Sequence, residues 1–355
     1  MKILFVPHTP TRELINRVYE FSKMTDSYFL SWYIDNSSFR NKVFSQLKTI
    51  FQKNKLENNI LTIPLLFRPE GLAVVFNTFM LNYVIKKYNI DLIVNANAWM
   101  FNVKDISVPV VYDLVDDHLT INHEVGVSAK RLYKIQEDLR ASRGIICVTE
   151  TLQKKANRFN YNTLTVENGV YIERFSESYS LKETLGLSGK KVYGYIGGVN
   201  AWTGIDKACD AYIRIKNKTN AMIVVGDDDS DFFKNLKIKY SNDILFIGQV
   251  SPERVGNYFK TLDIGLIPFD LNEYTRNAFP IKALEYGLAG AMVISTKLSV
   301  LEEKNFPFIE FCEIRDFPKL MKYIEKKEYT FKFDNYSWKK QSEKILNFIN
   351  KIDES

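Results

Sequence analysis

The chain has 355 residues, of which 46% are hydrophobic and 25% charged, a composition typical of a soluble globular protein and long enough for two domains with separate cores. Its net charge of +6 at pH 7 is mild and spread along the chain, so it is compatible with an anionic partner but gives no reason to expect a nucleic acid. No run of about 18 apolar residues occurs, which excludes a predicted membrane span.

The first residues predict a buried strand. Ile3 to Val6 are consecutive apolar residues between one lysine and Pro7, a segment too short for a signal peptide. The cysteines lie far apart, mostly in apolar surroundings and without metal-ligand spacing, so buried reduced thiols are expected at Cys147, Cys209 and Cys312. These features predict a cytoplasmic protein.

Residues 40–55 form a basic amphipathic segment with apolar residues at helical spacing. Such a helix can lie on an anionic membrane, which would place the protein at the inner face of the cell membrane. The same pattern describes a helix that packs on a sheet with its lysines in water, which is the commoner case. The apolar positions are Val43, Phe44, Leu47, Ile50 and Phe51, and the basic ones are Arg40, Lys42, Lys48, Lys53 and Lys55.

Short apolar runs alternate with helical patterns along the chain, which predicts α/β domains with parallel, doubly wound sheets. The alternation pauses where a strand runs into the turn Asn168-Gly169 and a polar stretch follows, so a domain boundary is expected there. We predict Rossmann-like domains at 1–170 and 171–334 and a C-terminal helix in 335–355. The expected strands are residues 3–6, 28–33, 60–65, 92–95, 108–113, 144–148, 191–196, 221–225, 244–247, 264–268 and 291–295.

Carboxylates and a histidine follow the strand at residues 108–113. Ligands of doubly wound sheets bind beyond the carboxyl ends of the strands, and Asp113, Asp116, Asp117 and His118 would share that edge. Histidine titrates near neutrality and a neighbouring carboxylate can fix its tautomer, so the cluster is suited to orienting or deprotonating an acceptor hydroxyl. The alternative is a set of turn and capping residues with His118 merely exposed.

Glycines follow two strands of the second half. Gly197 and Gly198 would let backbone N–H groups approach a phosphate closely, with an ordinary tight turn as the alternative. Gly226 ends the next strand and precedes residues 227–230, three aspartates and a serine. These are expected to cap the following helix, and a divalent cation is the less favoured alternative.

A polar loop at residues 271–279 leads into the next helix. It carries Thr275, Arg276 and Asn277 directly before a helix N-terminus. Backbone N–H groups and a guanidinium in this position suit a charged sugar and its phosphates.

The helix at residues 280–290 begins with a proline and ends with a glycine, and Ile281 lies in its first turn. Lys282 and Glu285 are three residues apart and share one face near its N-terminus. A cation there can reach a diphosphate while a carboxylate accepts two ribose hydroxyls. The alternative is a solvated ion pair.

Taken together, these motifs resemble the glycosyltransferases of the GT-B fold, family 4 type, in the branch that makes bacterial surface polysaccharides. The resemblance covers most of the chain, from about Val108 to Ile349. It rests on Tyr112-Asp113, Asp116 to His118, Glu167 to Val170 with Arg174-Phe175, Gly194 to Gly198 with Trp202, Asp263 to Phe269, Pro280 to Gly290 and Tyr336 to Lys339.

The resemblance implies two domains that face a central cleft, with the C-terminal helix returning to the first domain. The first domain would bind a glycan or lipid-linked acceptor, and the second a UDP- or GDP-sugar, with no other cofactor and no metal. Transfer would retain the anomeric configuration. The implied catalytic residues are Asp116, Asp117, His118 and Lys282. The implied acceptor-binding residues are Thr11, Arg12 and Asp113, and the implied donor-binding residues are Gly197, Gly198, Gly226, Thr275, Arg276, Asn277, Ile281, Lys282 and Glu285.

The sequence departs from the family pattern at the donor site. Asn277 stands where the family often has a second glutamate, and Val199 and Thr203 lie near the family's arginine and lysine positions. Lys282 and Arg276 would then supply the charge that faces the diphosphate. Two other functions stay open: a degenerate partner subunit that binds a nucleotide-sugar, and a sugar-nucleotide 2-epimerase.

Overall fold

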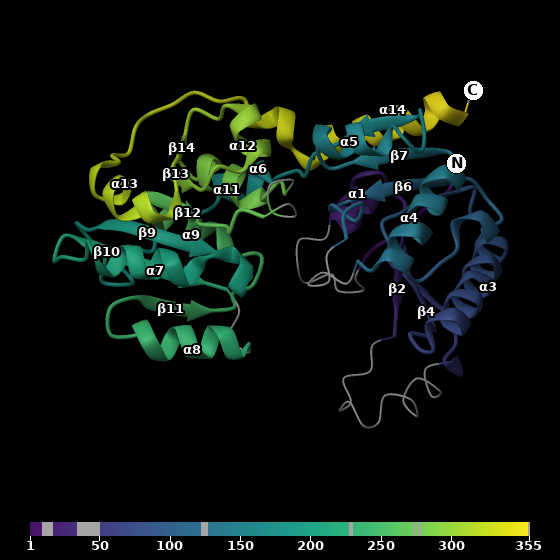
Figure 1. The fold of residues 1–355 in the computed structure, drawn as a ribbon, viewed down its shortest axis with the longest axis horizontal. Helices are drawn as coiled ribbons and strands as arrows, with labels where there is room; N and C mark the ends of the chain where they lie inside the picture. Colours follow the sequence, from purple (N-terminus) through teal and green to yellow (C-terminus); the bar gives the residue numbers. More distant parts are fainter. Residues whose placement is uncertain are drawn as a thin grey trace. The chain divides into compact units, whose positions relative to one another are not determined.

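The computed structural model of the chain describes residues 1–8, 17–33, 50–121, 127–226, 230–272, 275 and 278–353. They form two units (Figure 1): unit 1 comprises Met1–Gly169 with Trp338–Ser355, and unit 2 comprises Val170–Ser337. Each unit has one sheet of mainly parallel strands connected through helices. The predicted fold class, two parallel-sheet α/β domains, is confirmed.

Unit 1 has an eight-stranded sheet in the order β3-β4-β2-β1-β5-β6-β7-β8, in which only the pair β3 and β4 is antiparallel. Its central strands are entirely buried, which explains their continuous apolar sequences. Its elements are β1 (Ile3–Val6), α1 (Arg17–Met24), β2 (Tyr28–Trp32), β3 (Lys55–Glu57), β4 (Ile60–Ile63), α3 (Glu70–Tyr88), β5 (Leu92–Asn95), η2 (Val103–Asp105), β6 (Val110–Leu114), α4 (Ala129–Ala141), β7 (Gly144–Cys147), α5 (Glu150–Ala156), β8 (Thr163–Thr165) and α14 (Trp338–Asp353).

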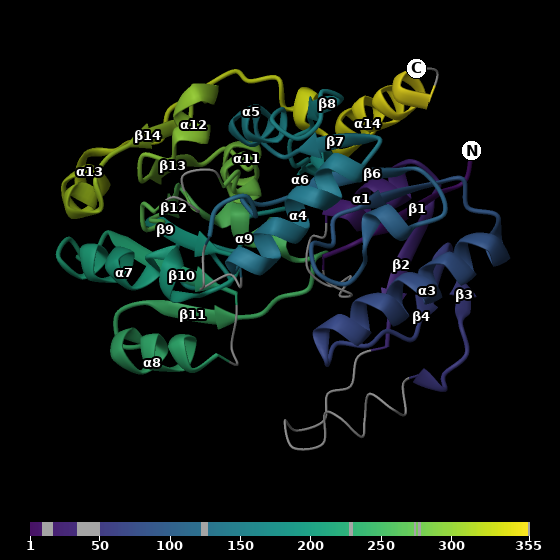
Figure 2. The same ribbon diagram turned by 45° about the vertical axis from the view of Figure 1, so that its right-hand side comes forward.

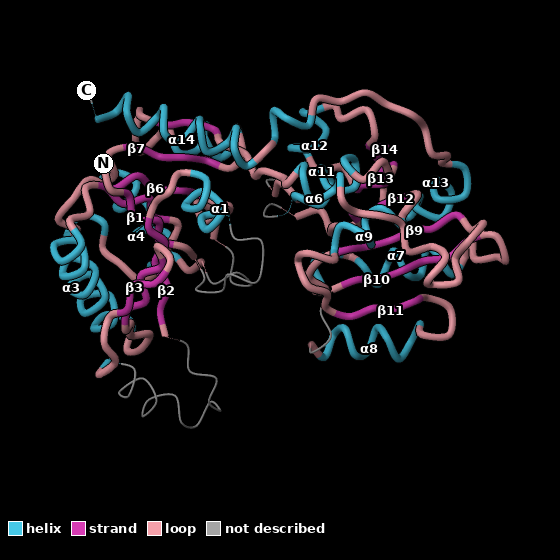
Figure 3. Tube along the Cα trace, turned by 180° about the vertical axis from the view of Figure 1, so that it is seen from behind, coloured by secondary structure: helices cyan, strands magenta, loops and turns pink. Residues whose placement is uncertain are grey.

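Unit 2 has a parallel six-stranded sheet in the order β11-β10-β9-β12-β13-β14, and Figure 3 shows β9, β10 and β11 side by side. Its strands and α-helices are α6 (Ile172–Ser176), β9 (Lys191–Ile196), α7 (Ile205–Ile213), β10 (Asn220–Val225), α8 (Asp231–Tyr240), β11 (Leu245–Gly248), α9 (Val255–Thr261), β12 (Ile264–Ile267), α11 (Ile281–Leu288), β13 (Met292–Ser295), α12 (Ser299–Lys304), β14 (Ile309–Phe311) and α13 (Phe317–Tyr323). Short 3-10 helices occur at η3 (Ala201–Thr203), η4 (Ile314–Asp316) and η5 (Phe333–Tyr336).

The C-terminal helix α14 belongs to unit 1, where it runs beside β7 (Figure 2). Trp338 is buried and packs edge-to-face on Phe21 of α1, with ring centroids 5.5 Å apart. A Cβ on Gly169 would lie 2.6 Å from the Trp338 ring, so this position at the end of unit 1 needs a glycine. The Arg143 side chain also donates to the carbonyl of Ile352 at 3.0 Å.

The predicted amphipathic helix at residues 40–55 lies mostly outside the described residues, and its described end differs from the prediction. Ile50 is helical, as predicted, but Phe51 to Asn54 are not, and Lys55 already begins β3. The Phe51 side chain is 84% exposed, so it packs on no sheet. Two short strands, β3 and β14, were not predicted, and β8 was expected only as the strand that runs into the turn Asn168-Gly169. Three-residue strands carry too little alternation to be recognised.

Among the described residues, no helix is both long enough and apolar enough to cross a membrane.

Candidate functional site

The turns that follow β9 and β10 meet at the carboxyl edge of the unit 2 sheet. Gly226 has φ +149°, and a Cβ on it would lie 2.0 Å from the backbone oxygen of Gly197. Only glycine permits this approach of two backbones. Gly197 is half-buried with φ +135°, and Gly198 is exposed, where a Cβ would lie 3.5 Å from Asn200 Nδ2, an ordinary contact distance. The predicted glycine motifs therefore form one surface at the sheet edge.

The ammonium group of Lys282, on the first turn of α11, lies against this glycine surface. A Cβ on Gly197 would lie 2.8 Å from Lys282 Nζ. The same Nζ lies 3.8 Å from the centre of the Tyr195 ring and 5.3 Å from that of Phe269, so aromatic faces hold the cation. In the described part of the chain no hydrogen bond or ion pair occupies Lys282 Nζ. The charge is fixed in place and available to an anion.

Tyr195 organises both parts of this surface. Its ring supports Lys282, and its hydroxyl donates to the carbonyl of Gly198 at 2.7 Å. The sequence analysis assigned no role to Tyr195 or Phe269, because aromatic residues at the ends of apolar strands are expected to be hydrophobic core residues.

Glu285 lies one turn further along α11 and is 7% exposed. Its nearest cation is Arg174 of α6, whose Nη1 is 3.9 Å from Glu285 Oε1. Burial raises the pKa of Glu285 to about 7, and the charges of Arg174 and Lys282 oppose that shift. A buried carboxylate with one long ion pair retains capacity to accept hydrogen bonds from a ligand.

Arg174 is a residue that the sequence analysis quoted but gave no role. Its guanidinium stacks 4.9 Å from the centre of the Tyr171 ring, which fixes it beside Glu285. Nothing local to α6 indicates this pairing, since the two residues are far apart in the chain.

Thr275 is fully buried, and its hydroxyl is used within its own loop. It accepts from the N–H of Asn272 at 3.0 Å and donates to the carbonyl of Asp270. We therefore revise its assignment from donor contact to a residue that shapes the loop. The predicted donor residues Arg276 and Asn277 lie outside the described residues, and Ile281 is half-buried at the start of α11.

Asp113, predicted to bind the acceptor, is buried at the end of β6 in unit 1. Its carboxylate accepts from Arg17 Nε at 3.0 and 3.2 Å, and Arg17 Nη1 reaches Asn168 Oδ1 at 3.3 Å. A carboxylate with no exposed surface cannot touch a substrate directly. Its assignment is corrected to a structural ion pair that ties β6 to α1.

Asp117, predicted to be catalytic, also makes its contacts within the protein. Its carboxylate pairs with Lys155 of α5 at 2.6 Å and accepts from the N–H of Leu119 and the hydroxyl of Thr120, each at 3.2 Å. Its side chain has no exposed surface. We correct its assignment to the residue that fixes the turn carrying His118.

His118 is half-buried at the carboxyl edge of unit 1. Burial lowers its pKa to about 4, the nearby His8 adds to that shift and Asp117 opposes it. The imidazole is therefore neutral near pH 7. Its ring lies 5.4 Å from that of Trp99, another residue the sequence analysis missed. Asp116 is half-buried beside His118, whereas the predicted acceptor residues Thr11 and Arg12 lie outside the described residues.

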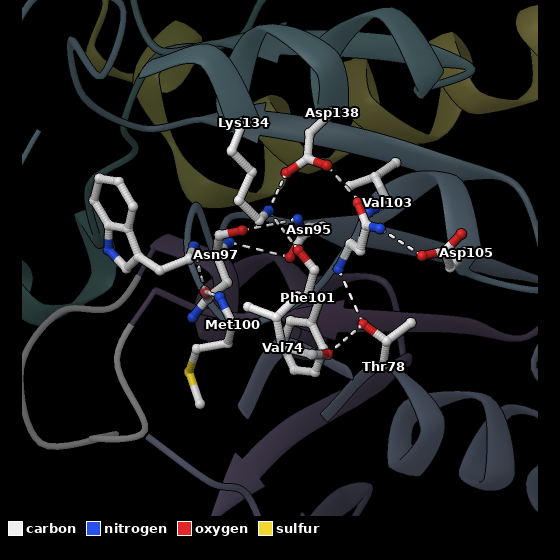
Figure 4. A network of polar contacts seen from close by, with 12 residues as sticks. Val74, Thr78, Asn95, Asn97, Met100, Phe101, Val103, Asp105, Lys134 and Asp138 are labelled. Atoms are coloured by element: carbon white, nitrogen blue, oxygen red, sulfur yellow. Dashed lines mark hydrogen bonds and ion pairs between the residues drawn. The ribbon is translucent and has the colours of Figure 1, made fainter. Parts of the chain in front are cut away.

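An asparagine network fixes the turn after β5 that carries Trp99 (Figure 4). Asn97 Oδ1 accepts from the N–H groups of Trp99 at 3.0 Å and Met100 at 2.9 Å. Asn97 Nδ2 donates to the carbonyl of Pro7 at 3.2 Å, and Asn95 Oδ1 accepts from the N–H of Asn97. The turn is thus rigid and holds Trp99 beside His118.

Replacing Asp113 with alanine is expected to lower the free energy of unfolding by about 3–5 kcal/mol, because it leaves the Arg17 guanidinium buried without its counter-charge. The control Glu137→Ala breaks an exposed pair with Arg140 and should cost less than about 1 kcal/mol. Urea unfolding followed by tryptophan fluorescence reports mainly on unit 1, which holds Trp32, Trp99 and Trp338. Equal losses in the two variants would contradict the structural role of Asp113.

A parallel α/β unit with glycine turns, a fixed cation and a buried carboxylate at one sheet edge has the features of a nucleotide-binding domain. Residues 190–310, within unit 2, match the family model described as "Glycosyl transferases group 1". Unit 2 therefore contains a group 1 glycosyltransferase domain, and the fold of the chain is that of the GT-B glycosyltransferases.

Among curated proteins, the chain is similar to TuaH of Bacillus subtilis strain 168, which carries a provisional assignment as a teichuronic acid biosynthesis glycosyltransferase. The two are 26% identical over 186 residues, 49% of this chain and 46% of TuaH. The match thus spans about half the length of that relative.

Two solved structures share the fold over nearly their full lengths. HepE of Anabaena, in complex with UDP, has a TM-score of 0.65 at 16% identity, covering 100% of this chain and 99% of HepE. Sucrose-phosphate synthase of Thermosynechococcus elongatus has a TM-score of 0.69 at 13% identity, covering 99% of each chain.

Proposed function

We propose that this chain is a glycosyltransferase that moves a sugar from a UDP-sugar to a glycan or lipid-linked acceptor in cell-surface polysaccharide synthesis. The observation that carries the proposal is the pair on α11, a fixed cation and a buried carboxylate one turn apart, against the glycine turn of β9. The group 1 domain supports a transferase, and the assignment of TuaH to teichuronic acid synthesis supports a surface polysaccharide.

In unit 2 each proposed donor contact follows from the chemistry of the site. Glu285 accepts hydrogen bonds from the ribose hydroxyls, and Lys282 faces the diphosphate across the N–H groups of Gly197 and Gly198. HepE structures with UDP, with UDP and glucose, and with UDP-glucose support a uridine nucleotide over a guanine one. Arg276 and Asn277 stay predictions.

In unit 1 we assign His118 to orient or deprotonate the acceptor hydroxyl, with Asp116 beside it in the same turn. Because the pKa of His118 is lowered, its imidazole is neutral, and one of its two ring nitrogens can accept a hydrogen bond from the hydroxyl. Fixed cations and a helix N-terminus can stabilise a leaving diphosphate, so the proposed reaction uses neither a metal nor a further cofactor. The resemblance to family 4 glycosyltransferases supports retention of the anomeric configuration as part of the proposal. A cytoplasmic location at the inner face of the cell membrane is part of the same proposal.

A thermal-shift screen with UDP, GDP and ADP tests the donor assignment. UDP should raise the melting temperature most, because a ligand that binds only the folded state stabilises it by mass action. Glu285→Gln should abolish the shift, whereas the exposed Glu302→Gln in α12 should keep it. If no nucleotide stabilises the protein, or if Glu285→Gln responds like the wild type, the donor site is wrong.

Release of UDP from UDP-glucose separates the remaining functions. A transferase releases UDP and passes the sugar to an acceptor or to water. A degenerate partner subunit binds the UDP-sugar without cleaving it, so no UDP appears. An epimerase converts the sugar nucleotide to its 2-epimer.

A further inference from the structure

Helix α3 presents a stripe of exposed apolar side chains, which we call the α3 stripe. Leu72, Val75, Phe79 and Tyr83 are 67%, 69%, 67% and 49% exposed. Their spacing of three, four and four residues places them on one helix face over about 17 Å. Surface helices normally carry polar residues on the outer face, so an apolar outer face signals a surface that another apolar surface covers.

The stripe is not a misplaced core face. The opposite face of α3 is already buried, and Asn77 fixes the helix through both side-chain atoms, accepting from the N–H of Leu66 and donating to its carbonyl at 2.8 Å each. Thr78 accepts from the N–H of Asn102 at 3.0 Å, and Asn82 accepts from the N–H of Ser107 at 2.8 Å. These bonds prevent rotation of α3, so the exposed side chains of the stripe stay outward. In Figure 1 the helix α3 itself runs along the edge of unit 1.

The charges around the stripe indicate what covers it. Lys86 and Lys87 follow it on the last turn of α3, and Lys87 Nζ lies 5.9 Å from the centre of the Tyr83 ring. The single acidic residue of the helix, Glu70, pairs with Arg131 at 3.1 Å. Unit 1 has 25 Lys and Arg against 19 Asp and Glu, whereas unit 2 has 23 of each. The net charge of +6 is therefore not spread along the chain but belongs to unit 1.

We propose that the α3 stripe docks unit 1 on an anionic lipid bilayer, with the apolar side chains among the acyl chains and Lys86 and Lys87 at the headgroups. Exposed apolar side chains can enter the acyl region, while a tyrosine and lysines at the end of the row keep their polar groups at the headgroups, where lysines are attracted to anionic lipid. A row one side chain wide is much smaller than the roughly 20–30 residues a side of a specific protein interface, which argues against a second copy as its occupant. The surface differs from the segment at residues 40–55, and the inference does not rest on the donor site.

Sedimentation of the full chain with vesicles tests the inference. We expect binding to vesicles of phosphatidylglycerol and phosphatidylcholine and little binding to phosphatidylcholine alone. The variant Leu72→Ser, Val75→Ser, Phe79→Ser should bind at least tenfold more weakly. Lys86→Glu with Lys87→Glu should remove the preference for anionic lipid. A matched control, Tyr161→Ser, Ile238→Ser, Tyr323→Ser, removes side chains 97%, 80% and 66% exposed elsewhere and should bind like the wild type.

A single insertion-reporting variant covers the case in which the triple variant fails to fold. Phe79→Trp should be quenched by brominated lipid more strongly than the native tryptophans. The inference is overturned if the wild type does not sediment with anionic vesicles, if the triple variant binds as well as the wild type, or if Phe79→Trp gains no quenching. A dimer seen in analytical ultracentrifugation that the triple variant abolishes, without vesicle binding, would instead make the stripe a contact between copies. A UDP-induced thermal shift, measured in parallel, reports separately on the donor site.

Discussion

Replacing Lys282 with methionine is expected to slow release of UDP from UDP-glucose by about 10²- to 10³-fold. Negative charge develops on the diphosphate as the glycosidic bond breaks, and a fixed cation stabilises that charge more than it stabilises the bound donor. Lys282 Nζ is already fixed by the Tyr195 and Phe269 rings, so it needs no rearrangement when the charge develops. Turnover measured at saturating donor reports this loss.

Binding measurements with UDP and uridine separate the charge of Lys282 from its packing. Lys282→Met should weaken the binding of UDP by about 10- to 100-fold, because a charge-assisted contact to phosphate is lost. The affinity for uridine, which has no phosphate, should be unchanged. The control Lys297→Met removes an exposed lysine two residues after β13, near the same sheet edge. Equal losses for UDP and uridine would mean that Lys282 acts through the shape of the site and not through its charge.

Glu285→Gln is expected to lower the affinity for both UDP and uridine by about 100-fold. In the wild type, two ribose hydroxyls donate to the carboxylate. In the variant, the amide oxygen accepts a weaker bond, and the amide NH2 group places donors where an acceptor is needed. The loss for uridine distinguishes this variant from Lys282→Met. Calorimetric titration of both ligands against both variants completes the comparison. A Glu285→Gln protein that loses UDP but keeps uridine would place the carboxylate away from the ribose.

The pH dependence of uridine binding offers a second test of Glu285. The pKa of this carboxyl is raised to about 7, so below that pH the folded protein carries the protonated form. A ligand that requires the carboxylate must then displace the proton, so affinity should rise with pH up to about 7 and level off above it. Glu285→Gln should show a flat profile, and a wild-type profile that is equally flat would contradict the assignment.

The raised pKa of Glu285 also makes the free energy of unfolding depend on pH. Between about pH 4.5 and 7 the folded chain retains a proton on Glu285 that the unfolded chain has lost, so this group lowers the free energy of unfolding as pH rises through that window. Relative to Glu285→Gln, the wild type should lose about 2 to 3 kcal/mol across it. Urea unfolding of the two proteins at pH 5 and pH 8 measures the difference.

The sequence by itself determined the fold class, and it predicted the sheet edge at which we propose the donor site. Buried parallel strands are continuous apolar runs, and a ligand site in such a sheet must follow the strand ends, so Gly197 and Gly226 could be predicted from local pattern. The shared face of Lys282 and Glu285 follows from helix periodicity alone. Each of these inferences needs only residues within one or two neighbouring elements.

The tertiary structure alone decided which polar residues remain available to a ligand. Asp113 and Asp117 read as site residues in the sequence, yet Arg17 and Lys155, from elements distant in the chain, neutralise and bury them. Conversely, Arg174 lies beside Glu285 only because α6 and α11 belong to the same unit. Ion pairing and burial depend on distances between segments that local periodicity does not encode. The sequence could therefore predict the sheet edges at which a ligand site is expected, while packing determined which side chains there remain available to a ligand.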